Sequence, residues 1–528
     1  MTVTPSAELL VVLDSSVEDQ QRWPADLPEP AGFGFRRVLT ERQRTDVARL
    51  LAMRHGGNFG VPGSGKTTVA YCLWAAERCR DEIDGLLVVA PPSAFEAWTM
   101  EAEACFTEET QPKVEVQPPL VSHRAEVVVI GYPRLLQRRV FAELDSWLSS
   151  RRVMIVFDES HRVKAGQRGA WGRAAARLAA RCQRRYVLSG TPMPNSLADI
   201  AAQFDLCWPG SGKQLAHGEL APSRDRIFVR TTKDQLNLPK LRTTIQRVPL
   251  DHEHRQVYEA LAGHAVRLLD DPSLVRNVSE LGAAVLRIIA AASNPAAVLD
   301  VGAELALPVR SGGASLEDVI RNAASQIRPA KLLRAAQLVE ANAARGRKTL
   351  VWSVFVSNVR ALADLLAAHH PAVITGATPF EDPRAQRDRV RELRRFRTDP
   401  ACSVLIATPQ TLGEGISLHQ VCVDQIHVDR TFNAGLYLQS LDRTHRLGMP
   451  ADSRPTTTLL LAEDTIDTWV HELLGGKIIQ MSRALNDLSL ERMQLPDIDE
   501  SLTLRDVFLE GEESAAALQD LLTRVRGH

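Results

Sequence analysis

The chain has 528 residues, 63 basic and 64 acidic side chains, and a formal net charge of −1. One hydrophobic core cannot serve so long a chain, so we expect two or three domains. No apolar run approaches the roughly 18 residues of a membrane span, and the first seven residues lack the basic and apolar character of an export signal. These features exclude membrane-spanning and secreted classes, and we expect a cytoplasmic protein without membrane contact.

The cysteines and the balanced charge exclude further classes. The seven cysteines are scattered and contain no C-x-x-C spacing. We therefore expect reduced thiols, and neither a zinc site nor a disulfide framework. The balanced charge gives no overall attraction to nucleic acid, although a cleft can still concentrate positive charge locally.

Residues 60–67 read GVPGSGKT, which fits the phosphate-binding pattern G-x-x-x-x-G-K-[ST], and a helical run follows over 68–80. In this pattern backbone N–H groups surround phosphates, the lysine reaches the β- and γ-phosphates, and the hydroxyl holds Mg²⁺. We expect ATP and Mg²⁺ as cofactors, with Lys66 catalytic and Thr67 a metal ligand. The residues expected to contact the nucleotide here are Gly60, Gly63, Ser64, Gly65, Lys66, Thr67 and Thr68.

Short apolar runs separated by helical patterns predict parallel sheets that are buried on both faces. In the first half these runs cover residues 86–91, 126–132, 153–159 and 186–192, with a helix over 172–181. In the second half they cover 349–355, 372–376, 403–408, 425–429 and 457–461, with a helix over 331–345. The predicted fold class is α/β, with two doubly wound parallel-sheet lobes whose ligands lie at the carboxyl ends of the strands.

The third apolar run ends in two adjacent carboxylates, Asp158 and Glu159. Burying adjacent acids is costly unless a cation compensates their charge. We expect Asp158 to hold Mg²⁺ and Glu159 to orient and deprotonate the attacking water. His161 follows at a spacing suited to relaying the nucleotide state, and Ser189 and Thr191 at the end of the next strand could bridge the acids to the second lobe.

Two other segments imitate functional motifs. Residues 210–214 read GSGKQ, but Gln214 stands where the metal-binding hydroxyl belongs and Cys207 occupies the first glycine position. No apolar strand leads into this segment, so we interpret it as an ordinary loop. The arginine-rich run 384–397 is interspersed with acids and is interpreted as a solvated helix face in preference to a DNA track.

The stretch 250–325 is rich in alanine and leucine with few strand patterns, so we expect a helical insertion between the lobes. The segment after 482 is mostly acidic and amphipathic, and we expect a solvated or partner-docking tail. The expected organisation is an N-terminal extension (1–35), an ATP-binding first lobe (36–245), the insertion (246–325), a second lobe (326–482) and the tail (483–528).

The second lobe carries two arginines near its end, Arg443 and Arg446, on a predicted helix where their spacing lets both point to one side. Two such arginines could neutralise the charge that develops during phosphoryl transfer, so we expect both to be catalytic. Gly413 and Gly415 are expected to close on the nucleotide, and Gln439 is expected to couple the lobes.

Together these motifs resemble the Swi/Snf-type branch of the superfamily-two ATPases over residues 36–480. Residues 88–98 (VVAPPSAFEAW) are similar to its motif Ia, 158–164 (DESHRVK) to its extended DEAH element, and 189–196 (SGTPMPNS) to its TGTP-x-x-N element. Residues 230–233 (RTTK) with 238–239 (LP) resemble its RRTK…LP brace. Further similar elements are Lys331, 352–355 (WSVF), Thr375-Gly376 and 439–448 (QSLDRTHRLG).

The resemblance implies two RecA-like lobes, a DEAH-box ATPase and ATP-dependent movement along double-stranded DNA without obligatory strand separation. Gln43 would recognise adenine, and Ser93 would grip one DNA strand from the first lobe. The corresponding residues of the second lobe would be Thr375, Gly376 and Thr408. Such phosphate contacts are independent of sequence and sensitive to salt. We expect a nucleoid-associated motor of a bacterial or phage repair, replication or defence system, working with protein partners.

The chain departs from the family pattern at three places. Residues 58–64 (NFGVPGS) replace the usual lead-in, Arg42 stands where an aromatic is usual, and Leu412 replaces a glycine. The leading hypothesis is a DNA-stimulated double-stranded DNA translocase, and a strand-separating or branch-migrating helicase on DNA or RNA is the alternative. A nucleotide-gated clamp for DNA or a partner is a second alternative, which the acid pair and both arginines disfavour.

Overall fold

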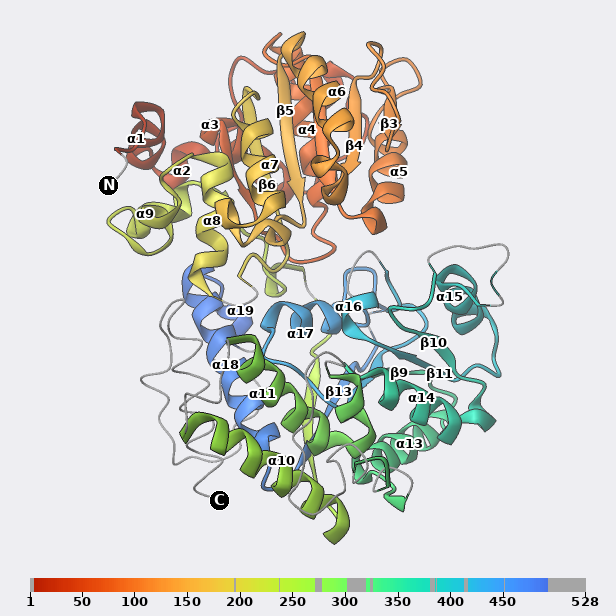
Figure 1. The fold of residues 1–528 in the computed structure, drawn as a ribbon. Helices are drawn as coiled ribbons and strands as arrows, with labels where there is room; N and C mark the ends of the chain where they lie inside the picture. Colours follow the sequence, from red (N-terminus) through yellow and green to blue (C-terminus); the bar gives the residue numbers. More distant parts are fainter. Residues whose placement is uncertain are drawn as a thin grey trace. The chain divides into compact units, whose positions relative to one another are not determined.

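The computed structural model describes residues 4–193, 196–236, 238–270, 278–301, 320–322, 326–379, 385, 387–412, 416–450 and 452–491. The described chain divides into two compact units. The first contains the residues up to 236 together with 479–491, and the second contains those from 238 to 478. Each unit has its own parallel sheet (Figure 1), so the predicted α/β class with two doubly wound lobes is confirmed.

Among the described residues, the first unit forms a seven-stranded parallel sheet in the order β3-β4-β2-β5-β6-β1-β7. Its strands are β1 His55–Asn58, β2 Gly85–Ala90, β3 Val114–Val116, β4 Val127–Gly131, β5 Val153–Asp158, β6 Arg184–Leu188 and β7 Phe228–Val229. Strands β2, β4 and β5 are buried along their whole length, as expected for aliphatic runs covered on both faces.

Helices cover this sheet on its two faces. They are α1 Ala7–Asp14, α2 Val17–Gln20, α3 Glu41–Met53, α4 Lys66–Cys79, α5 Phe95–Cys105, α6 Arg138–Ser149, α7 Ala170–Ala179, α8 Leu197–Cys207 and α9 Gly212–His217. Helix α4 packs between α3 and α5, whereas α7 packs on α8 and lies in front of the sheet in Figure 1. The segment 210–214 follows α8 and not a strand, as expected, but its residues 212–214 begin helix α9, so its interpretation as an ordinary loop is wrong for these residues.

The apolar runs predicted in the first half correspond to β2, β4, β5 and β6. The last run was placed too far along the chain, because β6 already ends at Leu188. Residues 189–192 form the loop after this strand, since the Ser189 N–H donates to the Asn58 carbonyl of β1 at 3.2 Å and closes the ladder there.

The second unit forms, within the described residues, a six-stranded parallel sheet in the order β10-β11-β9-β12-β13-β8. Its strands are β8 Arg242–Val248, β9 Thr349–Trp352, β10 Ala372–Ile374, β11 Val404–Ala407, β12 Asp424–His427 and β13 Thr456–Ala462. Strand β8 pairs in parallel with β13 over its full length. Residues 242–245, which the sequence analysis assigned to the first lobe, therefore lie in the second sheet, at its edge.

Helices of the second unit fill both faces of this sheet. They are α10 His252–Asp270, α11 Val278–Ser293, α13 Ala330–Ala343, α14 Val356–Leu365, α15 Arg389–Thr398, α16 Pro409–Leu412, α17 Ala434–Leu441 and α18 Ile466–Leu485, the last of which ends in the first unit, before α19 Leu488–Glu491. Helices α10 and α11 lie in the stretch interpreted as a helical insertion. Residues 302–319 of that stretch and the tail beyond 491 lie outside the described residues.

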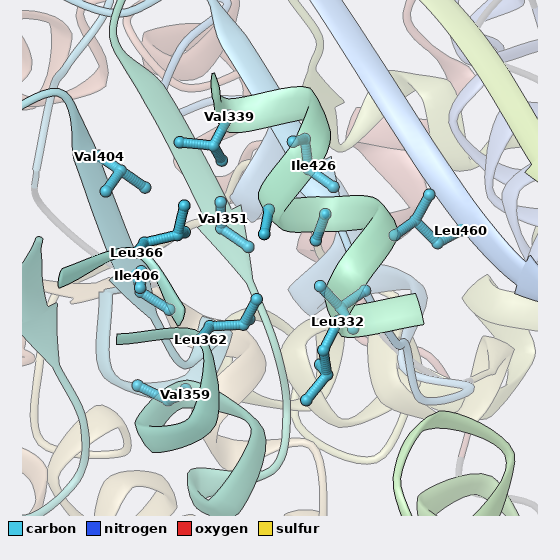
Figure 2. Close-up of a cluster of buried hydrophobic side chains, with 13 residues drawn as sticks. Leu332, Val339, Val351, Val359, Leu362, Leu366, Val404, Ile406, Ile426 and Leu460 are labelled. Carbon is cyan, nitrogen blue, oxygen red and sulfur yellow. The ribbon is translucent and has the colours of Figure 1, made fainter. Parts of the chain in front are cut away.

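Successive residues of β9 divide the second unit's core into two clusters. Val351 packs with α13 and α14 in the cluster drawn in Figure 2, next to Val404 and Ile426 of the neighbouring strands. Leu350 and Trp352 pack on the opposite face, which α15 covers. This period of two is the signature of a strand buried on both faces.

His55 of β1 carries a testable pH dependence. Only 3% of the residue is exposed, and its Nδ1 accepts a hydrogen bond from the Arg185 N–H at 3.2 Å. Burial, followed by the charge of Arg185, lowers the pKa of His55 from 6.5 to about 3. Between pH 6.5 and about 3, His55 is protonated in the unfolded chain and neutral in the folded chain. The free energy of unfolding therefore decreases as the pH falls through this range.

We expect this group to lower the free energy of unfolding by about 1.4 kcal/mol per pH unit well below its unfolded pKa. Because asparagine can accept the same N–H bond but does not titrate, His55→Asn should reduce the pH slope by about one proton. Urea denaturation of both proteins on either side of pH 6.5 measures this difference. Identical slopes in the two proteins would contradict it.

None of the described helices combines the length and apolar character that a membrane crossing demands.

Candidate functional site

The glycine-rich loop joins β1 to α4, and two of its glycines adopt left-handed backbone conformations. Gly63 has φ 87° and Gly65, the N-cap of α4, has φ 82°. The positive φ of Gly65 would strain any residue with a side chain, and a Cβ there would also displace the Gln43 amide, whose Nε2 would lie 2.1 Å away. The Lys66 ammonium donates to the Gly60 carbonyl at 2.7 Å. The strand, loop and helix start of an anion-binding loop are therefore in place.

Gln43 lies beside this loop at the start of α3. Its side chain and Thr40 form a capping box, and its Nε2 donates to the Ser64 carbonyl at 3.3 Å. Arg42, which replaces the usual aromatic, forms an ion pair with Asp46 at 3.3 Å and donates to the Arg230 carbonyl at 2.6 Å. The arginine therefore ties α3 to the segment after β7.

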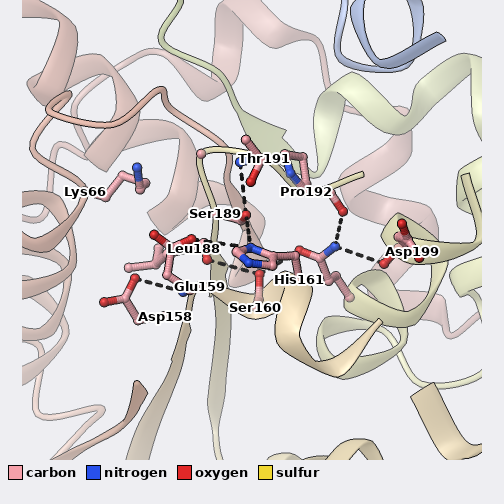
Figure 3. A network of polar contacts seen from close by, with 12 residues as sticks. Lys66, Asp158, Glu159, Ser160, His161, Leu188, Ser189, Thr191, Pro192 and Asp199 are labelled. Atoms are coloured by element: carbon pink, nitrogen blue, oxygen red, sulfur yellow. Dashed lines mark hydrogen bonds and ion pairs between the residues drawn. The ribbon is translucent and has the colours of Figure 1, made fainter. Parts of the chain in front are cut away.

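The acid pair stands where β5 ends (Figure 3). Asp158 is buried, and its Oδ1 accepts the Glu159 N–H at 3.0 Å while its Oδ2 accepts the Trp98 indole N–H at 2.9 Å. Burial, followed by the charge of Glu159, raises the pKa of Asp158 to about 6. Glu159 itself has the left-handed φ of 47°, which turns its side chain out of the strand direction.

Glu159 is linked to the loop after β6 through His161. The His161 Nδ1 lies 3.4 Å from Glu159 Oε2 and 3.0 Å from Ser189 Oγ, and Ser189 Oγ also accepts the Thr191 N–H at 3.2 Å (Figure 3). The structure therefore brings together Glu159 and the first-lobe residues predicted to couple the nucleotide state. The 3.4 Å approach of His161 to Glu159 and the hydrogen bond between His161 and Ser189 together link the acid pair to the loop 189–192.

The same loop touches the phosphate-binding loop directly. A Cβ on Gly190 would lie 2.7 Å from Cδ of Pro62, so a larger residue would push the two loops apart. From the other side, the Val61 N–H donates to the Thr231 carbonyl at 3.0 Å. The glycine-rich loop is therefore in close contact with the loop after β6 and hydrogen-bonded to the segment after β7.

Arg230 connects these loops through its guanidinium group. Its guanidinium donates to the carbonyls of Phe59 and Gly190, and it pairs with Asp487 at 2.7 Å. The other oxygen of Asp487 accepts the Ser489 N–H at 3.0 Å. Asp487 belongs to the segment that the sequence analysis assigned to an acidic tail, yet it is buried within the first unit.

Removing the Asp487 carboxylate should leave Arg230 as a buried charge without its ion-pair partner. We expect Asp487→Ala to lower the free energy of unfolding by about 3–5 kcal/mol. The exposed pair of Arg181 and Asp145 provides the control, and Asp145→Ala should cost less than about 1 kcal/mol. Chemical denaturation of the three proteins measures both effects, and equal stability of the two variants would show that the brace is dispensable.

The donor set at the carboxyl end of β5 fits a divalent cation. Two adjacent carboxylates place negative charge there, and burial, followed by the charge of Glu159, raises the pKa of Asp158. Hydroxyl and carboxylate oxygens are the ligands that Mg²⁺ prefers. Thr67 stands in the first turn of α4. The residues present are therefore suited to a magnesium–nucleotide complex.

In the second unit, the residues predicted to contact nucleic acid follow two adjacent strands. Thr375 and Gly376 follow β10, and Thr408 follows β11. The Thr408 N–H donates to the Ile374 carbonyl at 3.2 Å, and its hydroxyl shares a hydrogen bond of 2.7 Å with Thr411. The structure thus brings these residues together at the carboxyl edge of the sheet.

The predicted helix that should carry Arg443 and Arg446 is shorter than expected. Helix α17 ends at Leu441 and includes Gln439 but neither arginine. Beyond the end of the helix, the Leu418 N–H donates to the Arg443 carbonyl at 2.9 Å. Arg443 Nη1 donates to the Ile416 carbonyl at 2.8 Å.

Arg446 Nη1 donates to Ser417 Oγ at 2.7 Å. Both arginines therefore bond the same short segment, residues 416–417, which follows the predicted nucleotide contacts Gly413 and Gly415. These two glycines lie outside the described residues.

Family-like residues of the second unit form a buried polar network. Ser353 Oγ donates to Asp429 at 2.6 Å, and Asn358 Nδ2 donates to the same carboxylate at 2.9 Å. Lys331, whose side chain is fully buried, pairs with Asp467 at 2.6 Å. Burial raises the pKa of Asp429. This network fixes the ends of β9 and β12 relative to each other.

Two arginines of α15, which was interpreted as a solvated helix face, donate hydrogen bonds to backbone carbonyls of neighbouring loops. Arg389 donates to the Thr378 carbonyl at 2.9 Å, and Arg395 to the Pro371 carbonyl at 2.6 Å. They fasten the helix to the loops beside β10, so only part of this face is solvated.

Sequence comparisons identify two known domains in this chain. An SNF2-related domain matches residues 61–292, and a helicase conserved C-terminal domain matches residues 330–448. The SWI/SNF chromatin-remodeling complex subunit snf22 of Schizosaccharomyces pombe is 22% identical over 87% of this chain and 29% of its own length. The DNA repair and recombination protein RAD54B of Gallus gallus is 29% identical over 33% of this chain and 20% of its own length. The chain thus spans less than a third of either relative.

Among solved structures, the SWI2/SNF2 ATPase core of Sulfolobus solfataricus in complex with dsDNA covers 89% of this chain and 97% of its own, with 18% identity and a TM-score of 0.37. The resemblance inferred from the motifs is confirmed by the two domain matches. The chain belongs to the Swi/Snf-type branch of the superfamily-two ATPases, with an SNF2-related domain followed by a helicase conserved C-terminal domain.

Proposed function

We propose that this ATPase moves along double-stranded DNA and that the DNA stimulates its ATP hydrolysis. The observation that carries this proposal is the pair of contacts that join Glu159 through His161 to Ser189. A protein that only clamps its partner has no need of a base joined to a relay. The names of the curated relatives, which concern DNA repair and chromatin remodelling, support DNA as the substrate.

In the proposed reaction, the loop N–H groups and the Lys66 ammonium bind the phosphates of ATP. Thr67 and Asp158 would hold Mg²⁺, which supplies positive charge to the phosphate oxygens. Glu159 takes the proton of the attacking water. His161, so close to the Glu159 carboxylate, is placed to respond when that carboxylate changes its charge or its contacts.

The second unit contributes Arg443 and Arg446, which we propose neutralise charge that develops on the transferred phosphoryl group. Gln439 would couple the lobes, and Gly413 and Gly415 would contact the nucleotide. Ser93 in the first unit and Thr375, Gly376 and Thr408 in the second would bind DNA phosphates. The proposed setting is a nucleoid-associated bacterial or phage system with further protein subunits.

The test is ATP turnover with and without duplex DNA at low salt. We expect clear stimulation that falls steeply as salt rises, because phosphate contacts release counterions. Absence of stimulation at low salt would reject the proposal. Unwinding of forked DNA or of RNA duplexes would favour a strand-separating helicase, and DNA binding tightened by ATP without turnover would favour a clamp.

A further inference from the structure

Helix α5 touches both halves of the ATP site. One turn apart on the same face of this helix, Trp98 donates its indole N–H to Asp158 Oδ2 at 2.9 Å, and Glu101 accepts the hydroxyl proton of Thr68 in α4. Thr68 is the neighbour of the proposed metal ligand Thr67. A single helix therefore contacts the phosphate-binding helix and the metal-binding carboxylate together.

Trp98 is fixed in position by burial and by its contacts with Tyr71. Its side chain is fully buried, the Tyr71 hydroxyl donates to its carbonyl at 2.8 Å, and the two rings pack edge to face at 5.3 Å. On the other side of the contact, the Glu159 N–H fixes the second oxygen of Asp158. Each carboxylate oxygen retains a lone pair for a cation. The indole thus selects the carboxylate orientation.

The proposed DNA contact of the first unit lies directly before α5. Ser93 lies in the 3₁₀ turn Pro92–Ala94, and α5 begins at Phe95, directly after this turn. The turn is therefore joined directly to the helix that carries Trp98 and Glu101. Glu101 is further anchored by Arg37 at 2.7 Å.

We propose that α5 transmits DNA engagement at Ser93 to the ATP site, with Trp98 as the positioning residue that orients Asp158 and Glu101 as a second point of contact at Thr68. This inference rests on the proposed DNA-stimulated ATPase activity. It assigns to motif Ia a direct hydrogen bond to the acid pair, in addition to DNA binding.

The test compares Trp98→Phe with Trp74→Phe. Trp74 is an equally buried tryptophan of α4 that packs on Phe106, and its indole nitrogen has no hydrogen-bond partner among the described residues. Both changes remove the same atoms from the core, but only the first removes the bond to Asp158. The readout is the Mg²⁺ concentration needed for tight binding of fluorescent ADP, with and without duplex DNA.

We expect Trp98→Phe to raise the required Mg²⁺ concentration about 10- to 100-fold, as is typical when a partner of a metal ligand is lost. The effect of DNA on ADP binding and on kcat should shrink in the same variant, whereas the affinity for DNA itself stays unchanged. Trp74→Phe should behave as the wild type. Glu101→Leu, at a partly exposed position, should also weaken the DNA effect and serves if Trp98→Phe does not fold.

The two proposals fail in different ways. A wild-type protein that duplex DNA does not stimulate would reject the proposed function. A stimulated wild type whose Trp98→Phe and Glu101→Leu variants respond fully to DNA, with an unchanged Mg²⁺ requirement, would overturn the role of α5 alone.

Discussion

Glu159→Gln is expected to lower the rate of ATP hydrolysis by about 10²–10⁴-fold, because it removes the proposed general base. ATP binding should persist, since the phosphate-binding loop and Asp158 are unchanged. Glutamine matches glutamate in size and in backbone demands, so the left-handed φ of 47° at this position does not confound the comparison. The loss should appear in kcat and leave the affinity for ATP almost unaltered.

A matched control exists in the same unit. Asp81 also has a left-handed φ, 57°, and its carboxylate is exposed on the surface in an ion pair with Arg152. Asp81→Asn removes one charge under the same backbone constraint, so its turnover should equal that of the wild type. Rapid-quench turnover and equilibrium ATP binding measure the two quantities. An unaffected rate in Glu159→Gln would mean that another group activates the water.

The strands that the sequence revealed are those whose own residues require burial. The runs of β2, β4 and β5 are apolar apart from Asp158 at the end of β5, so a sheet covered on both faces is the solution that buries them. Strand β1 reads HGGN and has little intrinsic preference for a strand. It is extended because β6 and β7 pair with it on either side. The edge strand β8 escapes detection for another reason, because its residues are mostly polar and only partly buried.

In the candidate site, the residues of contiguous motifs could be predicted from the sequence, whereas contacts between residues far apart in the chain could not. The phosphate-binding loop and the acid pair are contiguous in sequence, and their chemistry can be inferred from residue types alone. The acceptor of the Trp98 indole and the partner of Arg230 lie 60 and 257 residues away along the chain. No local pattern marks Asp487 as buried, although an arginine in a core segment requires an acid or several carbonyls as partners.

Arg443→Ala is expected to lower kcat by about 10³–10⁵-fold, the range typical of an arginine that stabilises phosphoryl transfer. Arg443→Lys should recover only a small part of the loss, because an ammonium cannot reproduce the fixed fork of guanidinium donors. In the structure Arg443 also donates to the backbone carbonyls of Ile416 and Gln439. Its removal will therefore cost some stability as well as rate, and the two effects must be separated.

Arg255 makes this separation possible. It belongs to the same unit and donates to two backbone carbonyls, those of Glu463 and Asp464, at 2.7 and 2.8 Å. Arg255→Ala removes an equivalent set of carbonyl contacts with no proposed role toward ATP, so it should lower the unfolding temperature and leave kcat within about twofold of the wild type. If Arg443→Ala produced the same modest change in rate at equal loss of stability, its guanidinium would be a carbonyl anchor of the loop 416–417, and the phosphoryl-transfer role would pass to another cation.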